Sequence, residues 1–235
     1  MNPNAKQNRH TCLCLDYASG KAFCQPTVRT TSRRGQMTAG LVFCLFLGMV
    51  LTGCLDLKQP ALKVNYHALE YTAPAPSGRP ALPVALKINP LRAAAAYRST
   101  RMVYHPAPYA REAFVYHRWD ANPGRMLTDW LNRDLLHSAL FQAVVTAPSA
   151  LPATHVIEGT VDAFYAQNNG GAWSGVLTIS LALLALDDNR IIFQQPFSTS
   201  VPLDSLTPDA FAQSMTAGMQ TLSAEIIDVL YANLR

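Results

Sequence analysis

Cysteine is absent from the chain after residue 54, although the full sequence has 235 residues. All five cysteines lie at or before that point, at Cys12, Cys14, Cys24, Cys44 and Cys54. Residues 55–235 therefore cannot carry a disulfide framework, and none competes for the thiol of Cys54. Cys12 and Cys14 could suggest a metal site with His10, but the second pair that a tetrahedral site usually needs is missing.

The chain also lacks a hydrophobic run long enough to be an ordinary transmembrane helix. Its one uncharged apolar run covers residues 38–53, which is short of the ~20 residues that span a bilayer. This excludes a protein with several membrane spans. Wholesale disorder is excluded because 49% of the residues are apolar.

Acidic residues are scarce in the leader, where residues 1–53 hold six basic residues against the single acid Asp16. The rest of the chain carries 13 basic and 14 acidic residues, a net charge of −1. The overall charge of +4 therefore belongs to the leader. A nearly neutral body gives no argument for nucleic-acid binding.

The apolar run is flanked by the signals of a secreted lipoprotein. Two arginines precede it and Leu51-Thr52-Gly53-Cys54 ends it, and a basic segment before a short apolar one is typical of a signal peptide. The last four residues resemble the bacterial lipobox, in which processing enzymes recognise Leu51 and Gly53 and Cys54 receives the lipid. We expect Cys54 to carry a diacylglyceryl group and an N-linked acyl chain such as palmitate. The alternative is a short core segment that ends in an ordinary buried cysteine.

The residues after Cys54 indicate which membrane holds the anchor. Residue 55 is leucine, and Asp56 stands one place too late to act as the inner-membrane retention signal of proteobacterial lipoproteins. The pattern therefore predicts the periplasmic face of the outer membrane. Residues 1–27 are long and polar for a signal peptide, which we interpret as a start codon placed too far upstream, with translation beginning at Val28.

The predicted organisation has three parts. Residues 1–53 form the signal peptide with its over-extended start. Residues 54–83 form the lipidated N-terminus, a first strand and a proline-rich connection, because four prolines there exclude helix and central strand. Residues 84–235 form the main domain.

Hydrophobic periodicity predicts an α+β fold, with a mixed, largely antiparallel sheet and two main amphipathic helices on one of its faces. Strands are expected at 64–71, 82–88, 101–105, 113–119, 141–145, 157–165, 173–186 and 190–200, with a short helical turn within 91–98. The last three strands are expected to form an antiparallel meander. Asn122 and Thr207, each followed by proline, mark the starts of the two helices, at 123–139 and 207–232.

Two patterns identify the expected core faces. In the strand over 157–165 the odd positions are apolar and are expected to point inward, namely Ile157, Val161, Ala163 and Tyr165. In the last helix the apolar residues recur at spacings of three and four, namely Phe211, Met215, Met219, Leu222, Ile226 and Val229. This helix is expected to cover the sheet.

No catalytic motif is complete. Ser174 lacks the glycines two places away on either side that a nucleophile elbow needs, and it is expected on the polar face of a strand. The histidines of the body do not show the H-E-x-x-H spacing, and Gly170-Gly171 is not followed by the lysine of a phosphate loop. We expect no enzyme and no metal centre, although a zinc site assembled from distant residues stays an alternative.

Arginine and aromatic residues concentrate between residues 92 and 125. The candidate partner-binding residues are Arg98, Arg101, Tyr104, Arg111, Arg118 and Trp119. Arginine, tyrosine and tryptophan are the residue types enriched at interface hot spots. The readings left open are a solvated face and a docking surface for a protein or an anionic lipid. The predicted location in the periplasm argues against nucleic acid as the partner of these residues.

The same residues carry a resemblance to a known family. Arg98-Ser-Thr-Arg101-Met-Val-Tyr104, then Tyr116-His-Arg118-Trp119, then a helix with Leu127 and Leu131, resemble the ABC-type transport auxiliary lipoprotein family, which includes intermembrane transport lipoproteins. Such proteins also show a lipobox, a Tyr-x-Leu segment soon after it and a closing amphipathic helix. Tyr66 to Leu69 and residues 207–232 fill those places, whereas the alanines at 93–96 depart from the pattern.

The resemblance implies a non-catalytic lipoprotein that needs no cofactor beyond its covalent lipid. Its implied partners are an MCE-domain protein and an ABC permease and ATPase, which together move lipids or other hydrophobic molecules between the two membranes. A structural or assembly lipoprotein and a lipid-anchored periplasmic hydrolase are the alternatives. A homo-oligomer is a further partner state that the sequence leaves open.

Overall fold

The computed structural model describes residues 62–235, which belong to one compact unit over Gln59–Arg235. Leu51, Gly53 and Cys54 lie outside the described residues, as do the signal peptide and the cysteine pair near the start of the chain.

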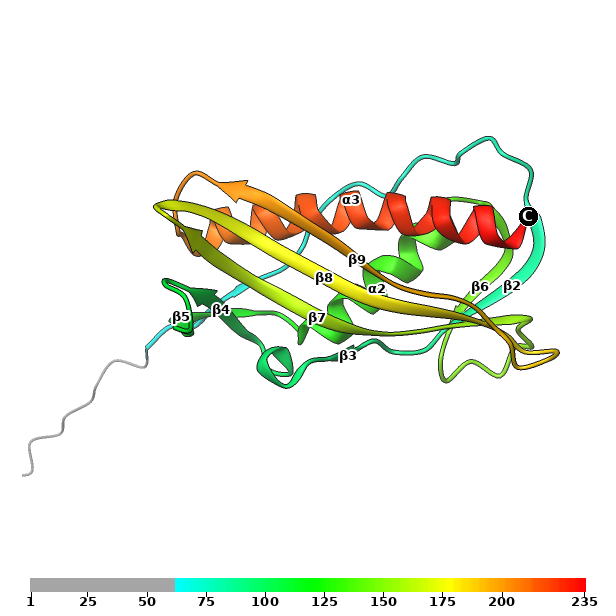
Figure 1. Ribbon diagram of the computed structural model, residues 1–235, viewed down its shortest axis with the longest axis horizontal. Coiled ribbons are helices and arrows are strands. Elements are labelled where there is room, and N and C mark those ends of the chain that lie inside the picture. The colour runs from blue at the N-terminus through cyan, green and yellow to red at the C-terminus, as the bar shows by residue number, and fades with distance from the viewer. Residues whose placement is uncertain (1–61) are drawn as a thin grey trace, which may run out of the picture. The chain divides into compact units, whose positions relative to one another are not determined.

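The described chain folds into a nine-stranded mixed sheet with both long helices on one of its faces, which confirms the α+β expectation (Figure 1). In chain order the elements are β1 (Asn65–His67), β2 (Leu82–Ile88), β3 (Arg92–Ala93), the 3-10 turn η1 (Ala95–Tyr97), β4 (Arg101–His105), β5 (Glu112–Trp119), α2 (Pro123–His137), β6 (Phe141–Thr146), β7 (His155–Asn169), β8 (Ala172–Ala185), β9 (Ile191–Leu203) and α3 (Pro208–Leu234).

Strand β7 is the centre of the sheet. On one side it pairs antiparallel with β8, which pairs antiparallel with β9, so the predicted meander is confirmed. On its other side β7 pairs in parallel with β2, β3 and β4, each along a different part of its length. Strand β2 continues to β6, while β4 continues antiparallel to β5 and from there to the edge strand β1.

Both helices begin where their sequence signals predicted. The side chain of Asn122 accepts a hydrogen bond of 3.1 Å from the backbone N–H of Arg125, and Thr207 caps α3 in the same way through Ala210. Each N-cap is followed by proline, whose missing N–H costs nothing in the first turn.

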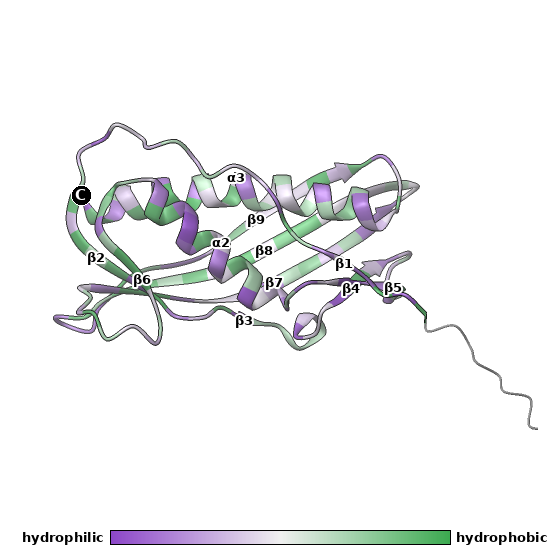
Figure 2. Cartoon of the chain, turned by 180° about the vertical axis from the view of Figure 1, so that it is seen from behind, coloured by the Kyte–Doolittle hydropathy of each residue, from purple (hydrophilic) through white to green (hydrophobic). Residues whose placement is uncertain are grey.

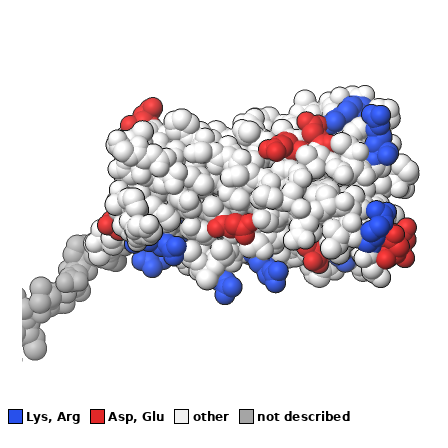
Figure 3. All heavy atoms as spheres, in the orientation of Figure 1, with Lys and Arg blue, Asp and Glu red and all other residues white. Residues whose placement is uncertain are grey.

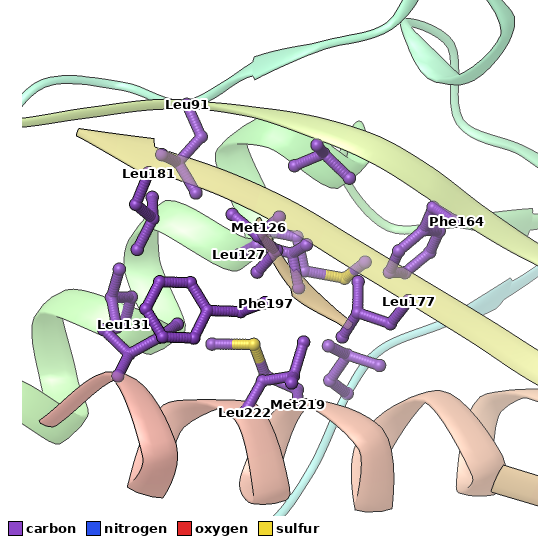
Figure 4. Close-up of a cluster of buried hydrophobic side chains, with 14 of the residues drawn as sticks. Leu91, Met126, Leu127, Leu131, Phe164, Leu177, Leu181, Phe197, Met219 and Leu222 are labelled. Carbon is purple, nitrogen blue, oxygen red and sulfur yellow. The ribbon is translucent and has the colours of Figure 1, made fainter. Parts of the chain in front are cut away.

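The core lies between the sheet and the two helices. Leu127 and Leu131 of α2 meet Met219 and Leu222 of α3 beside Phe197 of β9 (Figure 4). Seen from behind the view of Figure 1, α2 lies in front of the strands, and hydrophobic and hydrophilic stretches alternate along α3 (Figure 2). The predicted inner face of α3 is confirmed from Phe211 to Ile226, all of it buried.

Strand β1 is shorter than the strand expected over 64–71. Its partner β5 ends at Trp119, which lies opposite His67, so the ladder has no further partner strand. The chain then turns away from the sheet and buries Leu69 in the core.

The expected inner face of β7 is wrong in its second half. A bulge lies between Val161 and Ala163, and one extra residue there reverses which side chains point inward. Phe164 and Ala166 are therefore buried, and Tyr165 points to the face opposite the helices.

Candidate functional site

The candidate surface is built on the hairpin of β4 and β5 and on the turn η1 that precedes it. In the view of Figure 3, basic side chains are spaced along the lower edge of the molecule, where Figure 1 places β5, β4, η1 and β3. The hairpin is irregular: Arg101 lies opposite Arg118, but Val103 lies opposite Ala113, so β5 has extra residues in between.

Three of the predicted arginines are exposed, namely Arg98, Arg101 and Arg111. Arg98 follows η1 directly, and its Nε donates a hydrogen bond of 3.3 Å to the carbonyl oxygen of Ala93. No ion pair involves any of the three within residues 62–235. Their charges are therefore available to an external anionic group.

Arg118 and Tyr104 form hydrogen bonds within the β4–β5 hairpin. Nη1 of Arg118 donates to the carbonyl oxygens of Phe114 at 2.6 Å and His117 at 2.9 Å, which holds the irregular part of β5 together. The Tyr104 hydroxyl donates to Oε2 of Glu112 at 2.6 Å. This hydrogen bond, together with burial, raises the pKa of Tyr104 above its usual range.

Trp119 is not part of an exposed surface, which corrects its place among the partner-binding candidates. Its side chain is fully buried and packs edge-on against Phe164 of β7 and Phe211 of α3, at ring distances of 5.1 Å and 5.3 Å. The resemblance motif therefore mixes surface and core residues. Trp119 ends β5 and anchors that strand beneath the first turn of α3.

A stack of rings next to the arginines was not predicted from the sequence. The ring of His105 stacks on that of Tyr165 with 4.2 Å between the ring centroids, and the ring of Tyr97 stacks on Tyr165 as well, at 6.0 Å. Burial, and then the positive charge of Arg111, lower the pKa of His105. The β7 bulge creates this stack by turning Tyr165 outward, so no local pattern could have shown it.

The structure also brings together two histidines that the sequence showed only as scattered. Nε2 of His67 lies 2.8 Å from Nδ1 of His117, and the other ring nitrogen of His67 lies 3.4 Å from Asp209 at the start of α3. An open groove of about 480 Å³ runs from His67 along the first half of α3. The pair ties β1, β5 and α3 together.

Within residues 62–235 no group of three potential metal ligands occurs. Ser174 lies on β8, where its Oγ accepts a hydrogen bond of 3.5 Å from Nδ2 of Asn169. None of the helices in this part of the chain has the length and apolar character needed to cross a membrane.

Comparisons with known proteins give a fold and a family. Two solved structures share the fold: protein XCC0632 from Xanthomonas campestris, at 18% identity and a TM-score of 0.67 over 72% of this chain and 96% of that one, and an uncharacterized protein at 15% identity and a TM-score of 0.57 over 72% and 99%. No curated protein matches the chain.

The family model described as the ABC-type transport auxiliary lipoprotein component matches residues 67–227. The match runs from His67, the last residue of β1, to Ile227 of α3, and so includes the hairpin, the ring stack, all of α2 and most of α3. The chain belongs to the ABC-type transport auxiliary lipoprotein component family.

Proposed function

We propose that this protein is a non-catalytic, lipid-anchored auxiliary subunit of an ABC transport system that moves lipids or other hydrophobic molecules between the inner and outer membranes. The family match carries the auxiliary role. The lipobox-like Leu51-Thr52-Gly53-Cys54 supports an anchor at Cys54, and Leu55 with Asp56 supports the periplasmic face of the outer membrane. The partner is an MCE-domain protein or the permease and ATPase complex of that system.

The anchor is tested at Cys54. Transfer of a diacylglyceryl group requires the thiol, so Cys54→Ser should accumulate as an unprocessed precursor in the inner membrane. Mass spectrometry of the mature wild-type protein should show lipid on Cys54 as its first residue. A Cys54→Ser protein that is still acylated and sorted to the outer membrane would contradict the proposed anchor.

The partner surface is the set of three exposed arginines, Arg98, Arg101 and Arg111. They extend along η1 and both ends of the β4–β5 hairpin without an ion-pair partner in the described chain, although residues 55–235 carry nearly balanced charge. Exposed and unpaired arginines that face a partner favour association through electrostatic complementarity. We infer that an acidic surface of the transport complex docks here.

The experiment is a pull-down of the transport complex in detergent with the triple variant Arg98→Glu, Arg101→Glu and Arg111→Glu. Binding should be lost while the melting temperature stays within a few degrees, because exposed charge changes shift stability by less than ~0.5 kcal/mol each. A control with the same change of charge replaces Arg125, Arg190 and Arg235, which are exposed elsewhere. Equal binding by a folded triple variant and by the control would remove the arginines from the interface.

A further inference from the structure

Large apolar and aromatic side chains are exposed along one edge of the sheet. Tyr66 of β1 and Val115 of β5 are each 67% exposed, as is Leu62 just before β1, and Val64 and Tyr116 are exposed as well. Strands β1 and β5 are paired in parallel, with Tyr66 opposite Arg118, so these side chains belong to neighbouring strands. Tyr116 stands two residues before Arg118, so strand alternation predicts that it shares a face with Tyr66, whereas Val115 is predicted on the other face. Exposed apolar residues gathered on neighbouring strands mark an interaction site.

This edge lies at one end of the sheet. Strand β1 is the outermost strand on its side of β7, and Figure 2 shows β1, β4 and β5 together at the end opposite the β8–β9 turn. Strand β1 has only three residues, and its neighbour β5 is irregular. A partner would therefore contact the side chains of this edge rather than extend the sheet through backbone hydrogen bonds.

The charge of this end differs from that of the rest. Residues 62–67 and 98–119 hold five basic residues, including Lys63, against the single acid Glu112. The remaining residues of 62–235 hold seven basic and twelve acidic residues. Three more acidic residues lie at this end: Glu70 and Asp209 line the groove beside His67, and the N–H of Asp120 donates to the His67 carbonyl oxygen. With them, the end holds five basic and four acidic residues, an excess of one positive charge. The basic residue within the apolar edge is the exposed Lys63, which forms no ion pair among residues 62–235 and favours contact with anionic headgroups.

The chain itself limits how far this edge can be from a membrane. Leu62 follows Cys54 by eight residues. Even a fully extended connection of that length spans at most about 29 Å, because each residue contributes no more than ~3.6 Å. A lipid on Cys54 therefore holds the start of β1 close to the bilayer.

We propose that the edge formed by Leu62, Val64, Tyr66, Val115 and Tyr116 rests on the anionic phospholipid surface into which the Cys54 lipid is inserted. The proposal rests on the lipid anchor of the proposed function. Tyrosine is enriched where an apolar body meets the headgroup layer, and basic residues beside it attract anionic headgroups. The contact fixes one orientation of the domain, with the β8–β9 turn directed away from the membrane.

The test uses the whole mature lipoprotein, reconstituted into vesicles of phosphatidylethanolamine with phosphatidylglycerol. Because residues 55–235 contain no cysteine, Tyr66→Cys or Tyr116→Cys provides one site for an environment-sensitive fluorophore. Leu186→Cys and Ile191→Cys are matched controls, since both are exposed apolar residues next to the β8–β9 turn. Nitroxide-labelled lipids should quench the fluorophore at 66 and 116 several-fold more than at 186 and 191.

Further variants and a change of lipid test whether the basic and apolar residues of this edge cause the quenching. Lys63→Glu with Tyr66→Asp, in the Tyr116→Cys background, should reduce the quenching to the level of the controls, and so should vesicles made only of zwitterionic lipid. Equal quenching at both ends of the sheet, or none at 66 and 116, would overturn the proposal. Protection of 66 and 116 only after a purified partner is added would also overturn it, because the edge would then be a protein interface. Lipid on Cys54 is verified by mass in each preparation, so a missing anchor is recognised as a failure of the proposed function.

Discussion

The hydroxyl of Tyr71 donates a hydrogen bond of 2.5 Å to Oδ2 of Asp134, and so joins the segment after β1 to the last turn of α2. The carboxylate is fully buried, and Nε of Arg133 donates to its other oxygen at 2.9 Å. The Arg133 guanidinium also lies over the rings of Tyr71 and Trp130. Burial, and then this hydrogen bond, raise the pKa of Tyr71, so the tyrosine stays a donor at physiological pH.

We predict that Asp134→Ala strongly destabilises the fold, by about 3–5 kcal/mol, because it leaves Arg133 without its buried partner. Tyr71→Phe should cost about 1–3 kcal/mol, since Asp134 then loses one of its donors. Chemical denaturation measures both. Asp129→Ala on the same helix is the control, because Asp129 is exposed and pairs with Arg125 only at 3.9 Å. A cost for Asp134→Ala as small as that of the control would contradict a stabilising role for the hydrogen bonds from Tyr71 and Arg133 to Asp134.

Trp119 gives a prediction that separates core from interface. Trp119→Ala should lower the free energy of unfolding by about 3–5 kcal/mol, because a large buried side chain leaves a cavity between β5, β7 and α3. Tyr116→Ala, three residues earlier and exposed, should change stability by less than ~0.5 kcal/mol. Urea unfolding of the two variants compares them directly. If Trp119→Ala left the free energy of unfolding unchanged, the Trp119 side chain would not be part of the core and would belong among the exposed candidates for partner binding.

Much of the fold could be predicted because its signals are local. Asn122-Pro123 and Thr207-Pro208 carry the N-caps of α2 and α3 within a few residues, and β2 and β4 occur within their predicted bounds. The β7–β8–β9 meander follows from turn residues between alternating strands. The exposure of Arg98, Arg101 and Arg111 also agrees with the candidate surface.

What could not be predicted depends on partners distant in the sequence. The bulge at β7 is set by its pairing with β8, and one extra residue exchanged the roles of Phe164 and Tyr165. Tyr71 and Asp134 are 63 positions apart, and no periodicity connects them. The sequence could not place Trp119, because tryptophan is common both in cores and at interface hot spots. Its packing against Phe211, 92 positions later in the chain, shows that it belongs to the core.

The lowered pKa of His105 predicts a loss of stability in acid. The unfolded histidine titrates near ~6.5, whereas burial and the charge of Arg111 keep the folded imidazole neutral to lower pH. The unfolded state therefore binds more protons, and the stability present above ~6.5 is lost as pH falls through the lowered pKa. His105→Gln should flatten the dependence of unfolding free energy on pH in this window, and Arg111→Gln should do so in part.

The comparison for His105 is His155, whose pKa is also lowered, by burial and by Arg190, although Asp187 and Asp188 partly oppose the shift. Because both histidines contribute, His105→Gln should leave a residual slope that is reduced further in the double variant with His155→Gln. Denaturation between about pH 5 and pH 8 measures the slopes. A His105→Gln slope equal to that of the wild type would show that the ring is charged equally in both states.

The last prediction concerns the place where the start of α2 meets the strand connection. An added Cβ at Gly124 would lie 2.4 Å from the carbonyl oxygen of Leu91, a backbone atom that cannot move aside cheaply. The same two segments are joined through Thr128, whose Oγ1 donates to the Gly124 carbonyl oxygen and accepts from the N–H of Leu91. Gly124→Ala must therefore separate groups that are hydrogen-bonded to each other.

Alanine normally stabilises a helix by up to ~1 kcal/mol relative to glycine, so the sign of the change is diagnostic. We predict that Gly124→Ala destabilises the protein by about 1–3 kcal/mol, as overpacking does elsewhere. Gly218→Ala in α3 is the matched control, because its nearest neighbour is a side-chain methyl of Thr199 at 3.2 Å that can shift. It should be neutral or slightly stabilising in the same urea titration. If Gly124→Ala stabilised the protein as well, α2 would have to start farther from Leu91 than the hydrogen bonds of Thr128 allow.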